Sequence, residues 1–341
     1  MIKKETVVKE YIFEDDRPFK SCHASTLVAL DQGDVLVSWF GGTAEKDSDV
    51  AIWISRRSGT TGEWSKPLKI ADEEGIAHWN PVLYVNRSGK ILLFYKVGHE
   101  ITEWFTRMIS STDNGYTWMA PVELVPGDIG GRGPVRNKPI ELACGTILAP
   151  ASIERPDFSS ASHPIIWESF VDISYDQGET WTRSHKISLP QSMLGNQNPF
   201  HSRGLIQPTL WQSNHLDVHM LIRSTEGFIF RSDSTDKGKT WSEAYPISVP
   251  NNNSGIDLVK LDNGYLLLVC TPISGMTTSS ARTPLVLLGS TDNGRTWKEE
   301  FVLEDHPGEY SYPAIITKDK QILITYTWKR ERVAFWSIQY H

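Results

Sequence analysis

Three histidines occupy equivalent places in the chain, at or just before the start of a predicted β-hairpin. His23 lies in Cys-His-Ala-Ser-Thr-Leu, His78 in Ala-His-Trp-Asn-Pro and His201 in Pro-Phe-His-Ser-Arg. Imidazole is the side chain best suited to general acid or base chemistry near neutral pH. We therefore predict that His23 and His78 are catalytic. A hydrogen-bonded structural role is the alternative, and it competes more strongly for His78 and His201 than for His23.

Basic side chains fall at the same edges of the predicted hairpins. They are Lys96, Arg136, Lys138 and Arg203. In a chain with a formal net charge of −7, four cations at one edge indicate a local anion-binding field, although solvated rim charges are the alternative. Asn80 and Gln207 each begin a hairpin, so we predict that they contact the same substrate.

The elements that must position these residues are visible as two repeats. The first is the phrase Ser-x-Asp-x-Gly-x-Thr-Trp, with copies beginning at Ser111, Ser174, Ser234 and Ser290 and a degenerate copy over 55–64. In such a phrase the Asp accepts backbone N–H bonds at a tight turn, the Gly supplies a positive φ and the Trp packs beneath. We predict that these four Asp boxes are structural turns.

The second repeat is a strand, a polar turn and another strand. It occurs at 25–39, 80–95, 137–149, 207–223, 254–270 and 311–326. Six hairpins, each followed by two more short strands, predict six four-stranded blades of about 57 residues. Helical periodicity is absent and no linker divides the chain. The predicted fold is therefore all-β, a six-bladed β-propeller with Asp-box repeats that forms a single domain over 1–341.

Composition limits the setting. The N-terminus lacks the apolar core of a signal peptide and no apolar run approaches membrane-spanning length, so we expect a cytoplasmic protein with no membrane partner. Three cysteines without a regular spacing suggest free thiols. The absence of a basic block argues against a nucleic-acid partner. No His, Asp or Cys group has metal-ligand spacing, so no metal or cofactor is predicted.

The Asp boxes on six hairpins resemble the sialidase (neuraminidase) superfamily of BNR/Asp-box propellers, over essentially the whole chain. Phrases such as Trp-Asn-Pro-Val-Leu and Glu-Tyr-Ser-Tyr-Pro resemble its predicted-neuraminidase branch, which is related to enzymes that cleave rhamnose from glucuronate. In that superfamily the boxes lie at the blade periphery. The catalytic groups project from the starts of the innermost strands, on the opposite face. The resemblance therefore implies a site at the edge where the histidines and cations lie.

The resemblance also assigns residues. Sialidases bind the substrate carboxylate with three arginines, of which the second and third match Arg223 and Arg282, and their nucleophilic tyrosine matches Tyr310. The first arginine falls on His23, and the glutamate that partners the tyrosine falls near Leu205. An apolar side chain cannot activate a tyrosine, so the sialidase mechanism is incomplete here.

Carboxylates for acid/base chemistry are few. Glu45, Asp47 and Asp49 follow Trp-Phe-Gly-Gly in the loop that holds the acid/base aspartate of sialidases, and we predict Asp47 for that role. Glu154 and Glu309 are weaker candidates. Since retaining hydrolysis normally needs two carboxylates or a Tyr with its Glu, β-elimination beside a uronate is a competing reaction.

Five tryptophans outside the boxes could stack on sugars, although core packing is the better expectation for each: Trp79, Trp104, Trp167, Trp211 and Trp328. Three functions remain open. The first is exo-cleavage of a glycosidic bond at an acidic, uronate-type sugar of an oligosaccharide by a His/Arg/Tyr site, through hydrolysis or elimination. The second is an exo-α-sialidase with a rearranged site. The third is a sugar-binding propeller without turnover.

Overall fold

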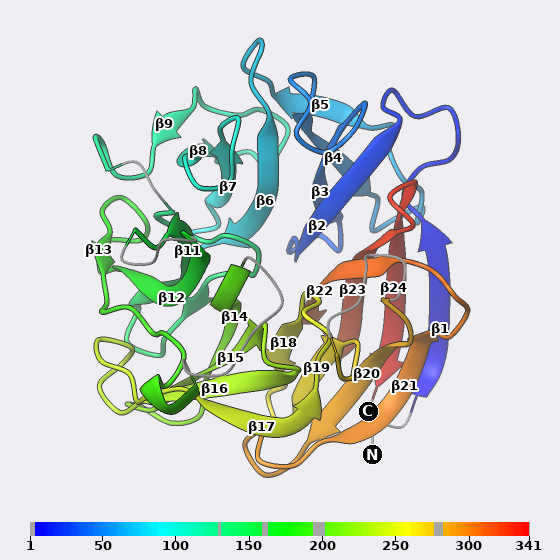
Figure 1. The fold of residues 1–341 in the computed structure, drawn as a ribbon. Helices are drawn as coiled ribbons and strands as arrows, with labels where there is room; N and C mark the ends of the chain where they lie inside the picture. Colours follow the sequence, from blue (N-terminus) through cyan, green and yellow to red (C-terminus); the bar gives the residue numbers. More distant parts are fainter. Residues whose placement is uncertain (1–3, 129–130, 159–162, 194–201, 276–281, 341) are drawn as a thin grey trace.

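The computed structural model describes residues 4–128, 131–158, 163–193, 202–275 and 282–340 (Figure 1). These residues form 24 β-strands and one short 3₁₀ turn, η1 (Gln191–Met193), with no α-helix. No helix within the described ranges could span a membrane.

The strands form six four-stranded blades arranged around a centre, as the sequence predicts (Figure 1). Blade 1 contains β2 (Ser21–Ala29), β3 (Val35–Gly42), β4 (Ala51–Arg57) and β5 (Leu68–Ala71). Blade 2 contains β6 (His78–Val85), β7 (Ile91–Val97), β8 (Phe105–Ser111) and β9 (Val122–Glu123). Blade 3 contains β10 (Ile140–Glu141), β11 (Ile147–Pro156), β12 (Ile165–Ser174) and β13 (Thr182–Arg183).

The remaining blades follow the same order. Blade 4 contains β14 (Ser202–Gln212), β15 (Val218–Ser224), β16 (Phe228–Ser234) and β17 (Tyr245–Pro250). Blade 5 contains β18 (Asp257–Lys260), β19 (Leu266–Cys270), β20 (Leu285–Ser290) and β21 (Lys298–Glu304). Blade 6 contains β22 (Tyr310–Lys318), β23 (Gln321–Trp328), β24 (Arg332–Tyr340) and β1 (Lys4–Tyr11).

Blade 6 closes the ring with both ends of the chain. Strand β1 pairs antiparallel with β24, from Lys4 opposite Tyr340 to Tyr11 opposite Ala334. The expectation that every hairpin is followed by two more strands is therefore wrong for the last blade, whose fourth strand comes from the N-terminal segment. The apolar faces of neighbouring blades pack together, as where Leu36 of β3 and Leu93 of β7 share one buried cluster.

Four of the six innermost strands contain a shift of register. The register of β2, β6, β14 and β22 shifts at a bulge. Each bulge holds a residue with positive φ: Ala24 (58°), Asn80 (42°), Gln207 (55°) and Tyr312 (54°). A bulge interrupts the strict alternation of side chains between the two faces of a strand. The four bulges therefore redirect side chains at equivalent places in four blades.

The Asp boxes connect the third and fourth strands of blades 2 to 5 and lock each blade to the preceding one. In the blade 4 box, Asp236 accepts hydrogen bonds from the N–H groups of Lys239 and Thr240 and from the Thr240 hydroxyl. Gly238 (φ 83°) leaves no room for a Cβ, which would lie 2.8 Å from Leu148 of blade 3. The boxes are the structural turns that the sequence predicts. The glycine of the blade 4 box also allows close packing against the preceding blade.

Candidate functional site

Four arginines and a histidine form one electrostatically coupled group, the arginine cluster: His23, Arg136, Arg223, Arg282 and Arg330. They come from blades 1, 3, 4, 5 and 6, so only the closed ring brings them together. Burial lowers the pKa of His23 well below its usual value, and the positive charges of the four arginines lower it further. His23 is therefore neutral at neutral pH, in a field that attracts anions.

Arg223, at the end of β15, is bound by neutral groups. Its Nε donates to Asn253 Oδ1 at 2.8 Å, and its Nη1 donates to Gln207 Oε1 at 3.0 Å. The guanidinium also lies 5.6 Å from the ring centroid of Trp167. Only 8% of the residue is exposed. These contacts fix the orientation of the cation while leaving its charge uncompensated by those partners.

Arg136 carries the most deeply buried charge of the cluster. Its Nη2 donates to the backbone carbonyls of Tyr312 and Pro313, and the guanidinium lies 5.1 Å from the Tyr312 ring centroid. Within the described residues, Nε and Nη1 have no hydrogen-bond partner. Burial lowers the pKa of Arg136 to about 10, which keeps the group charged at neutral pH. Buried, unpaired N–H groups on a cation favour an anionic partner.

Arg282 and Arg330 share the carboxylate of Glu309, at 3.5 and 2.9 Å. Arg330 also pairs with Glu45 at 2.6 Å. Compensating carboxylates thus gather on the Arg330 side of the cluster. Burial lowers the pKa of Arg282, and the charge of Arg223 lowers it further, which shows how closely these two cations are coupled. The sequence did not single out Arg330, which lies in the turn between β23 and β24.

Tyr312, and not Tyr310, is the tyrosine of the cluster. The Tyr312 ring stacks on His23 with centroids 4.2 Å apart, and His23 Nδ1 lies 3.0 Å from Thr327 Oγ1. The placement predicted for Tyr310 is wrong: that side chain is 2% exposed and packs edge-on against Tyr326 in a hydrophobic cluster. The register of β22 shifts between Ser311 and Ala314, so Tyr310 precedes this bulge and Tyr312 lies within it. The bulge breaks the alternation of side chains on which an alignment by sequence depends.

Gln207 is the side chain that meets the Tyr312 hydroxyl. Its Nε2 donates to Tyr312 Oη at 3.1 Å, while its Oε1 accepts from Arg223. The resemblance placed the missing glutamate near Leu205, but Leu205 is fully buried in the core of blades 3 and 4. Gln207 therefore stands where a base for Tyr312 would be needed, and an amide cannot accept the phenolic proton. The predicted contact of Gln207 with substrate stays a prediction.

Glu154 supplies a carboxyl group beside Arg223. It lies near the end of β11, where its partner in the sheet is Trp167 of β12. Burial raises the pKa of Glu154 to about 7, against the opposing effects of the Arg223 charge and the Trp167 indole. A carboxyl group with that pKa can both donate and accept a proton near neutral pH. The sequence ranked Glu154 low because nothing local shows that β11 ends beside an arginine of the next blade.

His78 has the structural role that was the alternative to catalysis. Its Nδ1 donates to the carbonyls of Val50 and Ile76, at 3.1 and 3.0 Å, and its Nε2 accepts from the backbone N–H of Glu73 at 3.0 Å. Both ring nitrogens are thus used by backbone groups. Burial lowers the pKa of the ring, which fits a neutral structural histidine. His201 lies outside the described residues.

Of two further predicted residues, Asp47 lies in an exposed turn and Asn80 lies in a bulge. Asp47 is exposed, in a turn where its N–H donates to the carbonyl of Ala44. Its loop reaches the cluster through the ion pair between Glu45 and Arg330. Asn80 is 4% exposed and occupies the bulge position that Gln207 and Tyr312 occupy in their blades. The roles assigned to Asp47 and Asn80 stay predictions.

The predicted cations divide between the cluster and other places. Lys96 donates to Thr106 Oγ1 and to the carbonyl of Arg132, both at 2.6 Å, and burial lowers its pKa to about 7. Lys138 pairs with Asp257 at 2.9 Å, which joins blades 3 and 5. Both contacts stabilise the packing of the blades, so the expectation that these two lysines bind substrate is not supported by where they lie.

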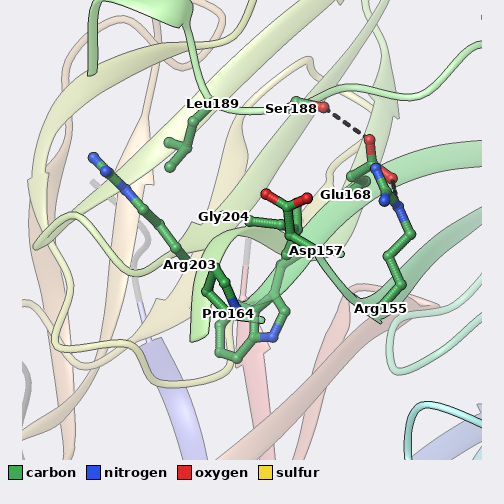
Figure 2. Close-up of a pocket in the computed structure, with 10 residues that line it drawn as sticks. Arg155, Asp157, Pro164, Glu168, Ser188, Leu189, Arg203 and Gly204 are labelled. Atoms are coloured by element: carbon green, nitrogen blue, oxygen red, sulfur yellow. Dashed lines mark hydrogen bonds and ion pairs between the residues drawn. The ribbon is translucent and has the colours of Figure 1, made fainter. Parts of the chain in front are cut away.

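Arg203 lines a cavity that lies beside the cluster, and Figure 2 shows the residues around this cavity. Arg203 pairs with Glu226 at 3.3 Å. Of the tryptophans, Trp167 borders both the cavity and Arg223. Trp79 and Trp211 are 1% and 2% exposed, which fits the expected core packing. No group of three potential metal ligands occurs in the part of the chain that the structure describes.

Comparison with known proteins agrees with this architecture. The family model of the BNR repeat-like domain matches residues 33–324. A protein of unknown function from Dyadobacter fermentans is 16% identical, with a TM-score of 0.74, and the match covers 100% of this chain and 99% of that one. No curated protein sequence gives a significant match.

Two of the similar structures are sialidases. The NanB sialidase from Streptococcus pneumoniae is 14% identical, with a TM-score of 0.73, over 97% of this chain and 70% of that one. The Trypanosoma rangeli sialidase is 14% identical, with a TM-score of 0.72, over 98% of this chain and 59% of that one. At these identities the likeness shows the fold alone. The resemblance to sialidase-type propellers is thereby confirmed for the fold, and by the family model this chain belongs to the BNR repeat-like domain family.

Proposed function

We propose that the protein is an enzyme that cleaves a glycosidic bond at an acidic, uronate-type sugar of an oligosaccharide. The observation that carries this proposal is the imbalance of charge in the arginine cluster. Within the described residues, two buried guanidinium nitrogens of Arg136, Nε and Nη1, have no hydrogen-bond partner, and Arg223 is held by neutral amides. A sugar carboxylate would supply the missing negative charge through bidentate contacts with guanidinium groups.

The catalytic group in this proposal is Glu154. Its pKa of about 7 lets it exchange a proton with substrate at neutral pH, next to the arginine that would hold the carboxylate. In elimination its carboxylate would take the proton from the carbon that bears the substrate carboxylate, and those electrons would form a C=C bond as the bond from the neighbouring carbon to the glycosidic oxygen breaks. Glu154 would then pass the same proton to the departing oxygen. In hydrolysis its carboxylic acid would protonate the leaving oxygen as that bond breaks. Water would then add to the anomeric carbon, and the proton that the water loses would return to Glu154.

Tyr312 and His23 have supporting roles. Tyr312 receives a hydrogen bond from the Gln207 amide, which orients the hydroxyl but provides no base. The depressed pKa of His23 makes it a weak base, so its stacking on the Tyr312 ring is the more useful contribution. We assign positioning to both residues, and Tyr312 also offers its hydroxyl to substrate.

A sialidase activity is the second candidate, favoured by the sialidases among the similar structures and by a tyrosine beside clustered arginines. It would need a base for Tyr312. The variant Gln207→Glu puts a carboxylate at that place. The sialidase candidate predicts that wild type releases sialic acid and that Gln207→Glu does so faster. Our proposal predicts no release by wild type.

The deciding experiment is an activity screen on uronate-capped and sialylated oligosaccharides, with ultraviolet absorbance for an unsaturated uronate and a reducing-sugar assay for hydrolysis. We expect turnover of the uronate substrate and its loss in Glu154→Gln. Binding of the uronate without any turnover would show a sugar-binding propeller instead. Failure to bind either acid would overturn the role of the arginine cluster.

A further inference from the structure

A cavity opens beside the arginine cluster, between blades 3 and 4. Figure 2 shows the side chains around it, and its volume is about 460 Å³. That volume is within the range of small-molecule sites in proteins. The blades are joined here by a short parallel pairing of β12 with β14, which sets Trp167 opposite Gly204.

The cavity and the cluster share one wall. Trp167 lines the cavity, and the Arg223 guanidinium lies over the same indole ring. Gly204 (φ 141°) allows the two strands to approach this closely, because a Cβ there would lie 2.1 Å from the carbonyl oxygen of Trp167. A ligand bound to the cluster could therefore extend past Trp167 into the cavity.

The charges around the cavity are compensated, unlike those of the cluster. Glu168 accepts from Arg155 and Lys186, each at 2.8 Å, and from the Ser188 hydroxyl at 3.2 Å. Arg203 pairs with Glu226, and Asp157 in the lining supplies a third carboxylate against the three cations. A second acidic group would find no excess of positive charge here. The electrostatics favour a neutral ligand.

The lining combines apolar surfaces with oriented polar groups. Ile166, Trp167 and Leu189 provide apolar contact area, while Glu168 and Ser188 lie where they can meet hydroxyl groups. A pyranose ring has the matching character, with apolar C–H faces and hydroxyls at its edge, and aromatic rings suit such faces. A saccharide unit fits this combination better than a charged or purely apolar ligand.

We propose that this cavity is a subsite for a neutral sugar unit, the neighbour of the acidic sugar held by the arginine cluster. This inference rests on the proposed function and extends it: the substrate has at least two sugar units, acidic at the cluster and neutral beyond Trp167. Residues of blade 3 and blade 4 together would then recognise the neutral sugar unit.

The test is calorimetric titration with glucuronic acid and with a sulfur-linked disaccharide of glucuronic acid and glucose, which resists cleavage. Wild type, Ser188→Trp and Ser188→Ala are compared, with Thr182→Trp on β13 as the matched control for an added exposed indole. Ser188 is exposed, so the larger side chain should block the cavity without entering the core. Circular dichroism checks the fold of each variant.

We expect wild type to bind the disaccharide about tenfold more tightly than glucuronic acid, a difference of about 1.4 kcal/mol. Ser188→Trp should remove this gain and leave the affinity for glucuronic acid unchanged, whereas Ser188→Ala and Thr182→Trp should keep most of it. Equal affinity of wild type for both ligands, or a gain that survives in Ser188→Trp, would overturn the subsite alone. If neither ligand binds wild type, the subsite and the proposed function fail together.

Discussion

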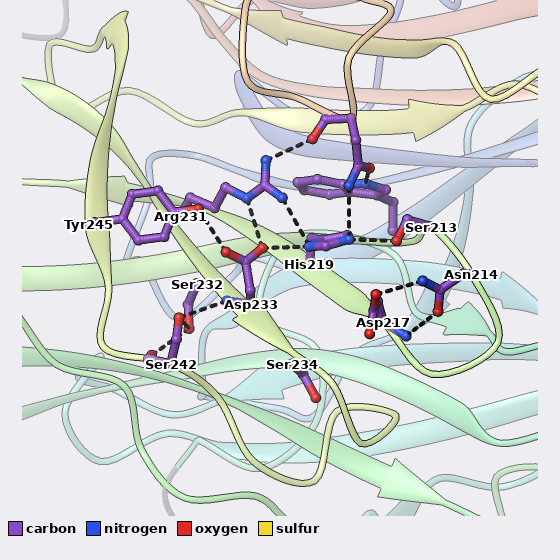
Figure 3. Close-up of polar contacts among 12 residues, drawn as sticks. Ser213, Asn214, Asp217, His219, Arg231, Ser232, Asp233, Ser234, Ser242 and Tyr245 are labelled. Carbon is purple, nitrogen blue, oxygen red and sulfur yellow. Dashed lines mark hydrogen bonds and ion pairs between the residues drawn. The ribbon is translucent and has the colours of Figure 1, made fainter.

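Blade 4 contains two buried arginines with opposite surroundings. Arg231 of β16 lies 5.1 Å from the ring centroid of Trp211, much as Arg223 lies over Trp167. Figure 3 shows Arg231 bonded to Asp233. Arg231 also donates to the backbone carbonyl of Asn293, in the Asp box of blade 5. Its distances to Asp233 and to the Asn293 carbonyl are 2.8 and 2.7 Å. Arg223, in contrast, is bound by two neutral amides.

The network around Arg231 is internally complete. Asp233 also accepts from the Tyr245 hydroxyl at 2.7 Å and lies 2.5 Å from His219 Nδ1. Burial opposes ionisation of Asp233, but the hydrogen bonds of His219, Tyr245 and Arg231 outweigh it and lower its pKa. Of these two arginines, Arg231 thus joins blade 4 to blade 5. Arg223, held by neutral amides, is the arginine to which the proposed function assigns a substrate carboxylate.

The largest expected effect concerns the carboxyl group beside the uncompensated arginine. Glu154→Gln keeps the shape of the side chain but cannot exchange a proton, so kcat on a uronate oligosaccharide should fall by about 10²–10⁴-fold. Wild type should also show an inflection near pH 7 that the variant lacks. An unchanged pH profile in Glu154→Gln would show that Glu154 is not the titrating group.

Glu154 should also leave a signature in stability. Because its pKa is raised in the folded state, its contribution to stability is present at low pH and is lost as pH rises through about 7. Glu154→Gln should therefore flatten the decline in urea-unfolding stability between about pH 4.5 and 7. A parallel decline in both proteins would contradict the raised pKa.

The two arginines themselves give the next largest effect. Arg223→Ala should weaken glucuronate binding by 2 kcal/mol or more, about 30-fold, if its charge is desolvated in the complex. Arg231→Ala is the matched control: it should lower the free energy of unfolding by about 1–3 kcal/mol, because Asp233 loses a partner, and leave affinity unchanged. Calorimetry and urea unfolding measure both quantities. Equal losses of glucuronate affinity in Arg223→Ala and Arg231→Ala would contradict the different roles of these two arginines.

A smaller effect is expected at the Asp boxes. In Gly238→Ala the new methyl group meets Leu148 at 2.8 Å and the residue keeps a positive φ, so stability should fall by about 1–3 kcal/mol. Because Gly264 has a similar φ and open space around it, Gly264→Ala is the control that isolates the strain of the backbone. Urea unfolding should show a larger loss for Gly238→Ala, with kcat unaffected in both.

The smallest effect is acid sensitivity of the boxes. The Thr296 hydroxyl and N–H lower the pKa of Asp292 to about 2. A depressed carboxyl pKa contributes stability above the unfolded value of about 4, and this contribution is lost as pH falls through about 2. Asp292→Asn should therefore lessen the loss of stability between pH 4 and 2, measured by urea unfolding. A slope identical to wild type would contradict it.

The sequence by itself determined the blades and the boxes, because their interactions are local. Each box completes its hydrogen bonds within eight residues, as Asp236 does with Lys239 and Thr240, and each hairpin pairs strands that are adjacent in sequence. It could not show that the fourth strand of blade 6 is β1, since that pairing joins the two ends of the chain.

The site was decided by tertiary structure. His23, Arg223 and Arg282 could be found from motifs, but Tyr312 replaced Tyr310 because a bulge changes the direction of side chains without changing their spacing in sequence. The pKa of Glu154 is raised by burial against the opposing charge of Arg223 from the next blade, and both effects arise only in the folded chain. The pairing of charges and the pKa of each side chain depend on groups from other blades, which meet only when the ring closes. The sequence therefore specifies the residue types, and the fold determines their protonation and charge pairing.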